Sequence, residues 1–469
     1  MKKTIILILI SLSIFSCKEY LDIKPYGKVI PQTADEFSSL LHSTLYEIDN
    51  GGPSVLIPNA SSIVVYDAIA DNLETSLTQL PEGGLLATYA GDRIGSNVNA
   101  SGNDAYTKYY QLIRNCNIII GEMKETESEL AKNVLGTAFA IRGICYYGLM
   151  REYCDIYDPQ QKYQLGLPIV TVFDMEARPV RSSLKETIEF IEDDLKKALS
   201  YNVQEEIYRF TVPVVKGYLA RFYFWTRQWD KAGNFATQVL DSHPLLDREG
   251  YRTMMTPDYP LKGNMLIKSE LYSTATEEEA GVGTYKPLQY RPVSKRFIDT
   301  FNDEEKAGDI RYEMNFSKIR ICTKFIFSGM RSAEMILIRA ESYYHLGDED
   351  NALEDINTLR SKRILNYTPL TQNTLPEPIN SDYIKQDVNG VPLTKLLSLI
   401  LTERRKELFM EGDRWFELKR NGRPEFWVAK NGLKYTTKKF MYTLPIPLSD
   451  IFQIPGLQQN EGYNELIVK

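Results

Sequence analysis

The sequence predicts an all-α dominated fold, a tetratricopeptide-like scaffold of helical hairpins with long irregular loops and few short strands. Three stretches carry this prediction, because each places a small residue three and four positions before a pair of aromatic residues. They are IRGICYYGL at 141–149, YLARFYFWT at 218–226 and IRAESYYHL at 338–346. At about 3.6 residues per turn, the small residue and the aromatic pair share one helix face, as in the packed helix pairs of repeat proteins.

A second small residue follows in two of the copies. Ala232 and Ala352 lie twelve positions after Ala220 and Ala340, beyond the breaks TRQWDKA and LGDEDNA. Small residues on both helices let the two backbones approach closely across a short turn. The copies begin at 141, 218 and 338, which is too uneven for a regular solenoid. We therefore expect a helical scaffold interrupted by long segments, chiefly 50–103 and 244–329, where binding sites are often built.

The partner helices are also predicted. Residues 104–124 are expected to pair with 128–153, residues 182–200 with 211–227, and residues 330–346 with 349–363. The second pair opens with SSLKE, which is typical of an N-capping serine followed by a glutamate in the first turn. A last helix is expected over 393–411, after a polar stretch at 364–392.

The first residues, MKKTIILILISLSIFS, have the layout of a secretory signal: two lysines, an apolar run and a small residue. The apolar run is well short of the roughly 20 residues that span a bilayer as a helix. The residues before Cys17 resemble a bacterial lipobox, in which the cysteine is acylated and holds the protein to a membrane. The alternative is an ordinary signal peptide followed by an incidental cysteine.

These observations divide the chain into four parts. We expect a signal peptide at 1–16, a lipidated tether at 17–30, an N-terminal helical region at 31–243 and a C-terminal region at 244–469. The other cysteines, with no CxxC spacing, are expected to be small buried hydrophobic residues: Cys116, Cys145, Cys154 and Cys322.

Composition and motifs exclude several classes of function. A net charge of −7 and a pI near 5.4 argue against a nucleic-acid partner. The three histidines lie in no HExxH or other metal-ligand spacing, and neither a GxSxG elbow nor a GxxxxGK loop is present. We expect no catalytic residue, no metal and no cofactor. The acidic runs at 277–279 and 303–305 are interpreted as solvated faces.

Charged residues recur at three- and four-residue spacing in LTERRKELFMEGDRWFELKRNG, residues 401–422. A carboxylate pair for catalysis is one interpretation of this stretch. The interpretation that we prefer is a structural network of ion pairs and caps that ties the last helix to the body. The closing PIP at 445–447 and QNEGY at 459–463 are expected to be extended chain laid across the scaffold.

Four stretches together resemble the SusD/RagB family of surface lipoproteins, the nutrient-binding partners of SusC-type TonB-dependent transporters. They are CKEYLDIKP after the lipobox, RSAEMILIRAESYYHLGDEDNALEDINTLRSKR at 331–363, the charged stretch at 401–422, and YTLPIPLSDIFQIPGLQQNEGY at 442–463. The resemblance implies a SusD-like fold, attachment to the outer membrane by the lipid, and exposure at the cell surface. It also implies a SusC-like transporter as the partner in polysaccharide utilization and nutrient uptake.

The resemblance further implies a ligand site in the segment before the first long repeat helix and in the large middle segment. Sugars are bound by aromatic platforms flanked by polar side chains. On this basis the candidate ligand-binding residues are Tyr89, Arg93, Asn97, Tyr285 and Tyr290. Each has the alternative of being a loop residue packed on the scaffold. Neither segment contains a tryptophan, and all four tryptophans lie in or next to predicted helices, namely Trp225, Trp229, Trp415 and Trp427.

The function implied is non-catalytic binding of an oligosaccharide or polysaccharide and its delivery to the transporter, with the protein acting as the lid. The alternative is a peptide-binding or purely structural lid of such a transporter. A glycan-degrading enzyme is a third and weaker possibility, because the sequence contains none of the catalytic motifs described above.

Overall fold

The computed structural model describes residues 31, 33–49, 54–58, 60–74, 89–98, 104–174, 176–255, 265–268, 288, 291–324, 326, 328–430 and 432–466. Several expectations fall outside these residues. They are the signal peptide at 1–16, Cys17 with its tether, Tyr285, Tyr290 and the acidic run at 277–279.

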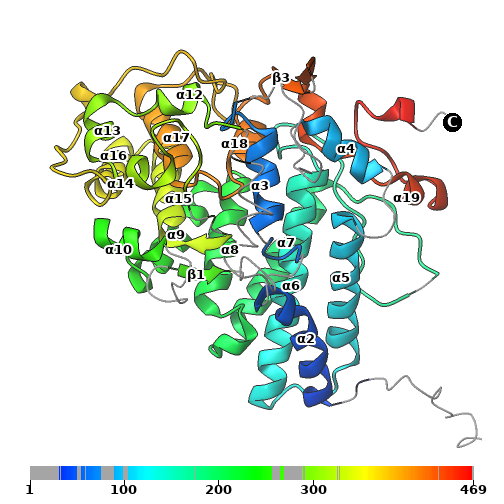
Figure 1. Ribbon diagram of the computed structural model, residues 1–469. Helices are drawn as coiled ribbons and strands as arrows, with labels where there is room; N and C mark the ends of the chain where they lie inside the picture. The colour runs from blue at the N-terminus through cyan, green and yellow to red at the C-terminus, as the bar shows by residue number, and fades with distance from the viewer. Residues whose placement is uncertain are drawn as a thin grey trace, which may run out of the picture.

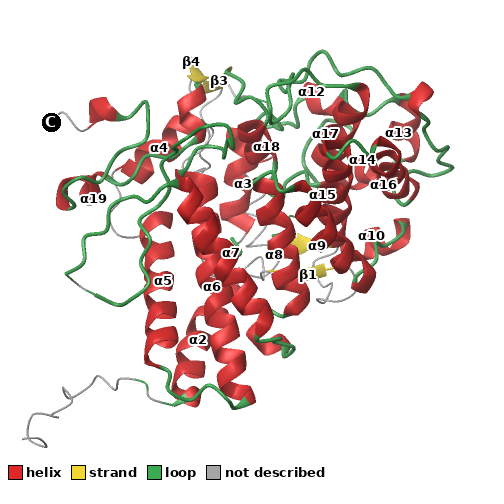
Figure 2. Cartoon of the chain, turned by 180° about the vertical axis from the view of Figure 1, so that it is seen from behind, coloured by secondary structure: helices red, strands yellow, loops and turns green. Residues whose placement is uncertain are grey.

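Helices dominate the described residues (Figures 1 and 2). In the N-terminal half they are α2 Ala34–Asp49, α3 Ala60–Ile69, α4 Ala90–Val98, α5 Ala105–Glu122, α6 Glu129–Tyr153, α7 Leu184–Ser200, α8 Val212–Trp225 and α9 Trp229–Ser242. In the C-terminal half they are α10 Arg248–Met254, α12 Lys295–Ile298, α13 Asp303–Gly308, α14 Ile310–Asn315, α15 Ser332–His345, α16 Glu349–Ser361, α17 Lys395–Glu407, α18 Arg414–Arg420 and α19 Leu448–Gln453.

The four strands form two small antiparallel sheets. Strand β1, Met265–Lys268, pairs with β2, Gly329–Arg331, and β3, Phe426–Lys430, pairs with β4, Leu433–Thr437. The all-α dominated prediction with few short strands is therefore confirmed. No helix among the described residues is long and apolar enough to cross a membrane.

The three predicted repeats lie on α6, α8 and α15, the first helices of successive hairpins. Their second helices are α7, α9 and α16, and α15 also packs against α9, so the hairpins form a continuous stack. Ala220, Ala232, Ala340 and Ala352 are all fully buried in these helix contacts. The small residues of the pattern therefore have the role that the sequence predicted.

One predicted pairing is wrong. Helix α7 was expected to pair chiefly with α8, but it packs mainly against α6, and α8 packs mainly against α9. Gly143 of α6 explains the close α6–α7 contact, because a Cβ atom there would lie 3.1 Å from the side chain of Leu195 on α7. Arg142 adds a buried ion pair to Asp194 at 2.7 Å across the same contact.

Helix starts agree closely with the capping signals. Ser183 accepts a hydrogen bond from the backbone N–H of Glu186, whose carboxylate in turn accepts from the Ser183 backbone N–H, a complete capping box. The side chains of Ser128 and Asp104 cap α6 and α5 by accepting a hydrogen bond from a backbone N–H of the first turn. These caps place α5, α6 and α7 within two residues of their predicted starts.

The main hydrophobic core draws on both halves of the chain. It includes Phe37 and Tyr146 from the N-terminal half, and Trp415 and Ile446 from the C-terminal half. The four described cysteines are buried and unpaired, as predicted. Burial raises the pKa of the Cys116 thiol to about 12, so it behaves as an inert apolar group.

The segment after α18 crosses back to the N-terminal half. The Leu444 N–H donates to the carbonyl oxygen of Glu152 on α6 at 2.8 Å. The Asn460 amide donates to the carbonyl oxygens of Tyr153 and Leu444 at 2.8 and 2.6 Å. The prediction of non-helical chain fixed across the scaffold is confirmed for 445–447 and 459–460, whereas 461–462 form a turn and helix α19 lies between the two stretches.

Candidate functional site

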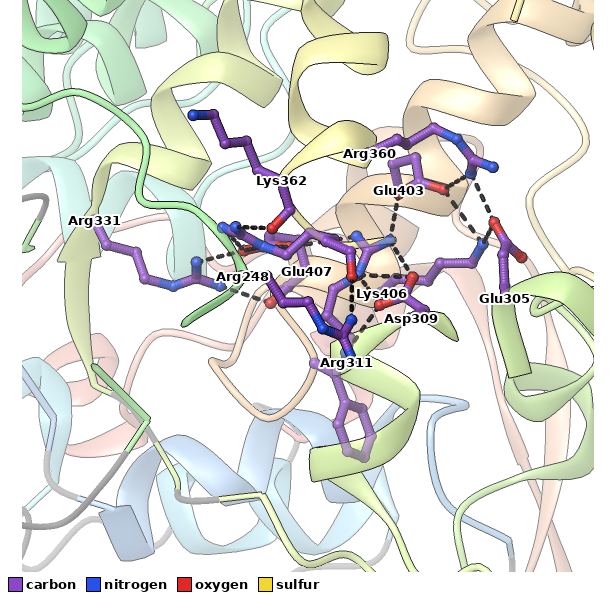
Figure 3. A network of polar contacts seen from close by, with 12 residues as sticks. Arg248, Glu305, Asp309, Arg311, Arg331, Arg360, Lys362, Glu403, Lys406 and Glu407 are labelled. Atoms are coloured by element: carbon purple, nitrogen blue, oxygen red, sulfur yellow. Dashed lines mark hydrogen bonds and ion pairs between the residues drawn. The ribbon is translucent and has the colours of Figure 1, made fainter. Parts of the chain in front are cut away.

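The charged stretch on α17 is part of a buried ion-pair network (Figure 3). Glu407 accepts from Arg331, Arg363 and Arg311 at 2.6, 3.0 and 3.3 Å. Burial alone would raise its pKa, but Arg363, Arg331 and Arg311 together hold the pKa of Glu407 well below its usual range. The carboxylate is therefore committed to structural contacts, as the sequence predicted.

Glu403 occupies the next part of the network. Its carboxylate pairs with Arg311 at 2.8 Å and with Arg360 at 2.5 Å. Glu305, in the acidic run at 303–305, was expected on a solvated face, but it is buried and pairs with Arg360 and Lys406 at 2.7 and 2.9 Å. The run forms the first turn of α13, and this helical turn places the carboxylate of Glu305 against α17.

Tyr89, the first candidate ligand residue, lies just before α4 and is partly buried. Its hydroxyl donates to the carbonyl oxygen of Thr436 at 3.1 Å, and its ring lies 5.1 Å from the ring of Tyr435. Asp92, on the first turn of α4, pairs with Lys430 at 2.5 Å. These contacts join α4 to the β3–β4 hairpin.

Arg93 points into the body of the protein. Its guanidinium donates to the carboxylate of Glu152 at 2.5 Å and to the Tyr66 hydroxyl at 3.0 Å, and it lies over the Tyr66 ring. Burial lowers the pKa of Arg93, but the Glu152 carboxylate and Tyr66 outweigh it and keep the guanidinium charged.

Asn97 is 6% exposed. Its amide nitrogen donates to the Pro445 carbonyl oxygen at 2.7 Å, and its amide oxygen accepts from the Tyr153 hydroxyl at 2.6 Å. Tyr89, Arg93 and Asn97 thus lie on one short segment, but in this structure they mainly fasten that segment to the scaffold. Ligand contact by any of them stays a prediction.

An exposed aromatic platform near this segment was missed by the sequence analysis. Trp427 is 52% exposed and lies on strand β3, rather than in or next to a helix as expected. It stands opposite Thr436 in the β3–β4 register. The Lys434 ammonium lies 5.0 Å from the centre of the Trp427 ring, close enough for a cation–π contact.

Alternation along the hairpin separates its two faces. Val428 and Tyr435 face the body, where Tyr435 meets Tyr89. Trp427, Lys434 and Thr436 share the opposite face. Tyr89 and the Asp92–Lys430 ion pair therefore hold the hairpin from one side, while Trp427 is presented on the other.

A polar cleft of about 540 Å³ lies at the base of the same hairpin. Glu425 comes directly before β3 and Lys438 directly after β4, and both side chains are exposed. Strand alternation places Glu425 and Lys438 on the Trp427 face. The rest of the cleft is lined by Asp155, Gln161, Gln164, Leu165, Arg423, Lys439, Phe440, Thr443, Asn460 and Glu461.

The cleft offers both signs of charge together with amide and hydroxyl groups. Arg423 pairs with Asp155 at 2.7 Å across it, and both side chains are more than a third exposed. Such donors and acceptors match the ring of hydroxyls on a sugar, and an exposed indole matches its apolar C–H face. The aromatic residue among those that line the cleft is Phe440, and Tyr163, which is 61% exposed, lies in the sequence between the cleft residues Gln161 and Gln164.

A sequence signal for this site was present. The stretch FWVAKNGLKYTT carries Asn-Gly between two runs with strand character, which is the strongest short-range signal of a β-hairpin. The charge pattern at helical spacing just before it favoured a helix near Trp427 over this strand alternation. The cleft itself combines residues 155–165, 423–440 and 443–461, and no local pattern brings those segments together.

Comparison with known proteins agrees with this architecture. The sequence model of the SusD family matches residues 323–463, and a second model, described as starch-binding associating with outer membrane, matches residues 19–224. A SusD-like protein of Formosa agariphila is 24% identical over 444 residues, with 79% of this chain and 82% of that protein covered.

Solved structures show the same fold. A SusD superfamily protein from Bacteroides vulgatus superposes with a TM-score of 0.69 at 17% identity, covering 92% of this chain and all of that one. A laminarin-binding SusD-like protein superposes with a TM-score of 0.60 at 15% identity, covering 92% and 99% of the two chains. The two family models match this chain in order, over residues 19–224 and 323–463, and the protein belongs to the SusD/RagB family.

Proposed function

We propose that this protein captures a glycan, an oligosaccharide or polysaccharide, on the Trp427 face of the β3–β4 hairpin and in the cleft below it. The observation that carries the proposal is the exposed Trp427 indole on a hairpin whose two ends, Glu425 and Lys438, line the cleft. The family description as starch-binding and the laminarin-binding neighbour support a carbohydrate as the ligand class. Binding is non-catalytic, and the captured glycan is passed to a SusC-like transporter.

The setting at the outer membrane supports delivery rather than stand-alone storage. The matched family is described as associating with the outer membrane, and we propose that Cys17 carries the lipid that holds this chain at the cell surface. An open site such as this one buries little ligand area and binds weakly on its own. Confinement beside a transporter raises the effective concentration of captured ligand without any new contact.

The first test is affinity electrophoresis of soluble protein that begins at Lys18 against a panel of polysaccharides. We expect retardation by at least one of them, and loss of about 1–3 kcal/mol of binding free energy, roughly 5- to 150-fold in Kd, in Trp427→Ala. Tyr46→Ala is the matched control, since Tyr46 is 66% exposed on α2, far from the hairpin in both views of the molecule.

Two results would contradict the proposal. Retardation that is unchanged in Trp427→Ala would place the glycan elsewhere, and Tyr89→Ala would then test the α4 segment. No retardation by any polysaccharide, together with binding of a peptide library, would favour a peptide-binding lid. Delivery is tested separately, by asking whether a SusC-like barrel protein is recovered with the native protein from detergent extracts.

A further inference from the structure

A second cavity lies inside the molecule and shares no lining residue with the hairpin cleft. Its volume is about 140 Å³, and it sits where α6 and α8 of the N-terminal half meet α17 and α18 of the C-terminal half. Aromatic rings form much of its wall, contributed by Tyr66, Tyr109, Tyr147, Tyr218, Phe224, Trp225 and Phe416. Nine charged side chains and a set of small or aliphatic residues form the remainder.

Three guanidinium groups of this wall have an unused donor. Among the described residues, Arg151 Nε, Arg404 Nη1 and Arg420 Nη1 have no hydrogen-bond partner, although each atom is buried. Arg404 and Arg420 are the two more deeply buried groups, and each forms an ion pair through another nitrogen. Arg404 pairs with Asp413 at 2.6 Å, and Arg420 pairs with Glu341 at 2.5 Å. A buried donor without a partner costs about 1–3 kcal/mol, and more when it is charged. Three such donors around one cavity therefore favour an acceptor inside it.

The wall also carries five carboxyl groups, but each is paired: Glu152 with Arg93, Glu334 with Arg221, Glu411 with Lys324, Asp413 with Arg404 and Glu417 with Arg414. The groups of the wall that are left without a partner are mostly donors, and this favours an anion. Three of its four arginines, Arg221, Arg404 and Arg420, form ion pairs with carboxylates. Within the described part of the chain Arg151 has no ion pair, and its guanidinium lies 3.7 Å from the centre of the Phe416 ring. Glu417, the wall carboxyl with an unpartnered oxygen, adds little opposing charge because burial raises its pKa to about 7.

We propose that this cavity binds one small anion, a halide or a small carboxylate such as acetate, held by Arg151, Arg404 and Arg420. A water molecule takes about 30 Å³ in the liquid, so the cavity has room for an ion of this size with a few waters. Because the donors come from α6, α17 and α18, the anion bridges the two halves of the fold and stabilises their junction.

The test uses the full mature protein and bromide as the probe. Crystals grown in bromide should show an anomalous peak within hydrogen-bond distance of at least one of the three unpartnered nitrogens. In solution, the Tm should rise when chloride or bromide replaces gluconate at constant ionic strength, because gluconate exceeds the size of the cavity. A ligand that binds only the folded state adds RT ln(1 + [L]/Kd) to the free energy of unfolding, where [L] is the free anion concentration.

The variant Arg151→Gln removes the unpaired charge and should weaken the halide effect at least tenfold in apparent affinity. Arg114→Gln, which removes an exposed arginine of α5, should behave like the wild type. If Arg151→Gln does not fold, the bromide peak and the Tm series of the wild type decide the question. Absence of the peak, a peak without a halide-dependent Tm, or an undiminished effect in Arg151→Gln would each overturn the proposal.

Discussion

Two buried charged regions meet at the end of α17, and they differ in how completely their charged groups are paired. On one side, Glu403 and Glu407 are surrounded by arginines and a lysine, and each of these two carboxylates has three partners (Figure 3). On the other side, Arg404 faces the internal cavity with one nitrogen unpartnered among the described residues. Adjacent residues of one helix therefore belong to a closed network, in which the carboxylates are paired, and to an open cavity wall, in which a donor is left without a partner. A closed network supports only the fold, whereas an open wall can also receive a ligand.

The largest effect is expected from breaking the closed network. Glu407→Gln should lower the free energy of unfolding by about 3–5 kcal/mol, because three buried guanidinium groups lose their shared negative charge. Urea unfolding followed by circular dichroism measures the change. Glu304→Gln, an exposed glutamate on neighbouring α13, should stay within about 0.5 kcal/mol of the wild type. Equal losses in the two variants would show that the network contributes nothing specific.

An intermediate effect, with a distinct pH dependence, is expected on the cavity side. Burial raises the pKa of Glu417 from an ordinary value of 4.5 to about 7, although Arg414 opposes this shift. The folded state therefore binds more protons than the unfolded state between pH 4.5 and 7, and the free energy of unfolding falls as the pH rises through that window. Glu417→Gln removes this contribution.

Relative to the wild type, Glu417→Gln should accordingly gain about 1–3 kcal/mol of stability between pH 5 and pH 8. Urea unfolding at four pH values in this range gives the difference directly. The same series with Glu304→Gln should show a difference that does not change with pH. A flat difference for Glu417→Gln as well would mean that this carboxyl is already ionised at pH 5.

The smallest effect on stability is expected at the hairpin. Trp427→Ala should change the free energy of unfolding by less than about 0.5 kcal/mol, because the side chain is more than half exposed. Trp415→Ala is the contrasting variant: its indole is buried and stacks 4.4 Å from the Tyr442 ring, so its loss should cost about 3–5 kcal/mol. Thermal unfolding compares the two. A large loss in Trp427→Ala would identify the indole as a packing residue and weaken its role as a platform.

The repeats were the part of the fold that the sequence predicted best. Small residues and aromatic pairs at helical spacing located α6, α8 and α15, and capping serines located the starts of α6 and α7. The role of the α17 charges was also predicted, because dense alternating charge on one helix is rarely catalytic. Their partners were not predicted: Arg311, Arg331 and Arg363 come from segments 44 to 96 residues away.

The sites were harder to predict for the same reason. Asn97 has the residue type of a sugar ligand, yet Tyr153 and Pro445 take up its amide, and the latter contact spans 348 residues. The packing partner of α7 depended on Gly143, whose importance appears only once Leu195 is placed beside it. Trp427 was accessible to prediction through the Asn-Gly turn, whereas the cavity has no sequence signature, since it is defined by atoms that lack partners.

The contacts of the closing segment have a consequence for how the chain reaches its native state. Leu444 and Asn460 bond to the last carbonyl groups of α6, and Lys419 donates to the Arg151 and Cys154 carbonyl oxygens at the same helix end. The last carbonyl groups of α6 therefore lack these hydrogen-bond donors until about 300 further residues have followed the helix. Contacts between such distant segments slow folding. A chain built in this way completes this part of its core only after its last residues have become available.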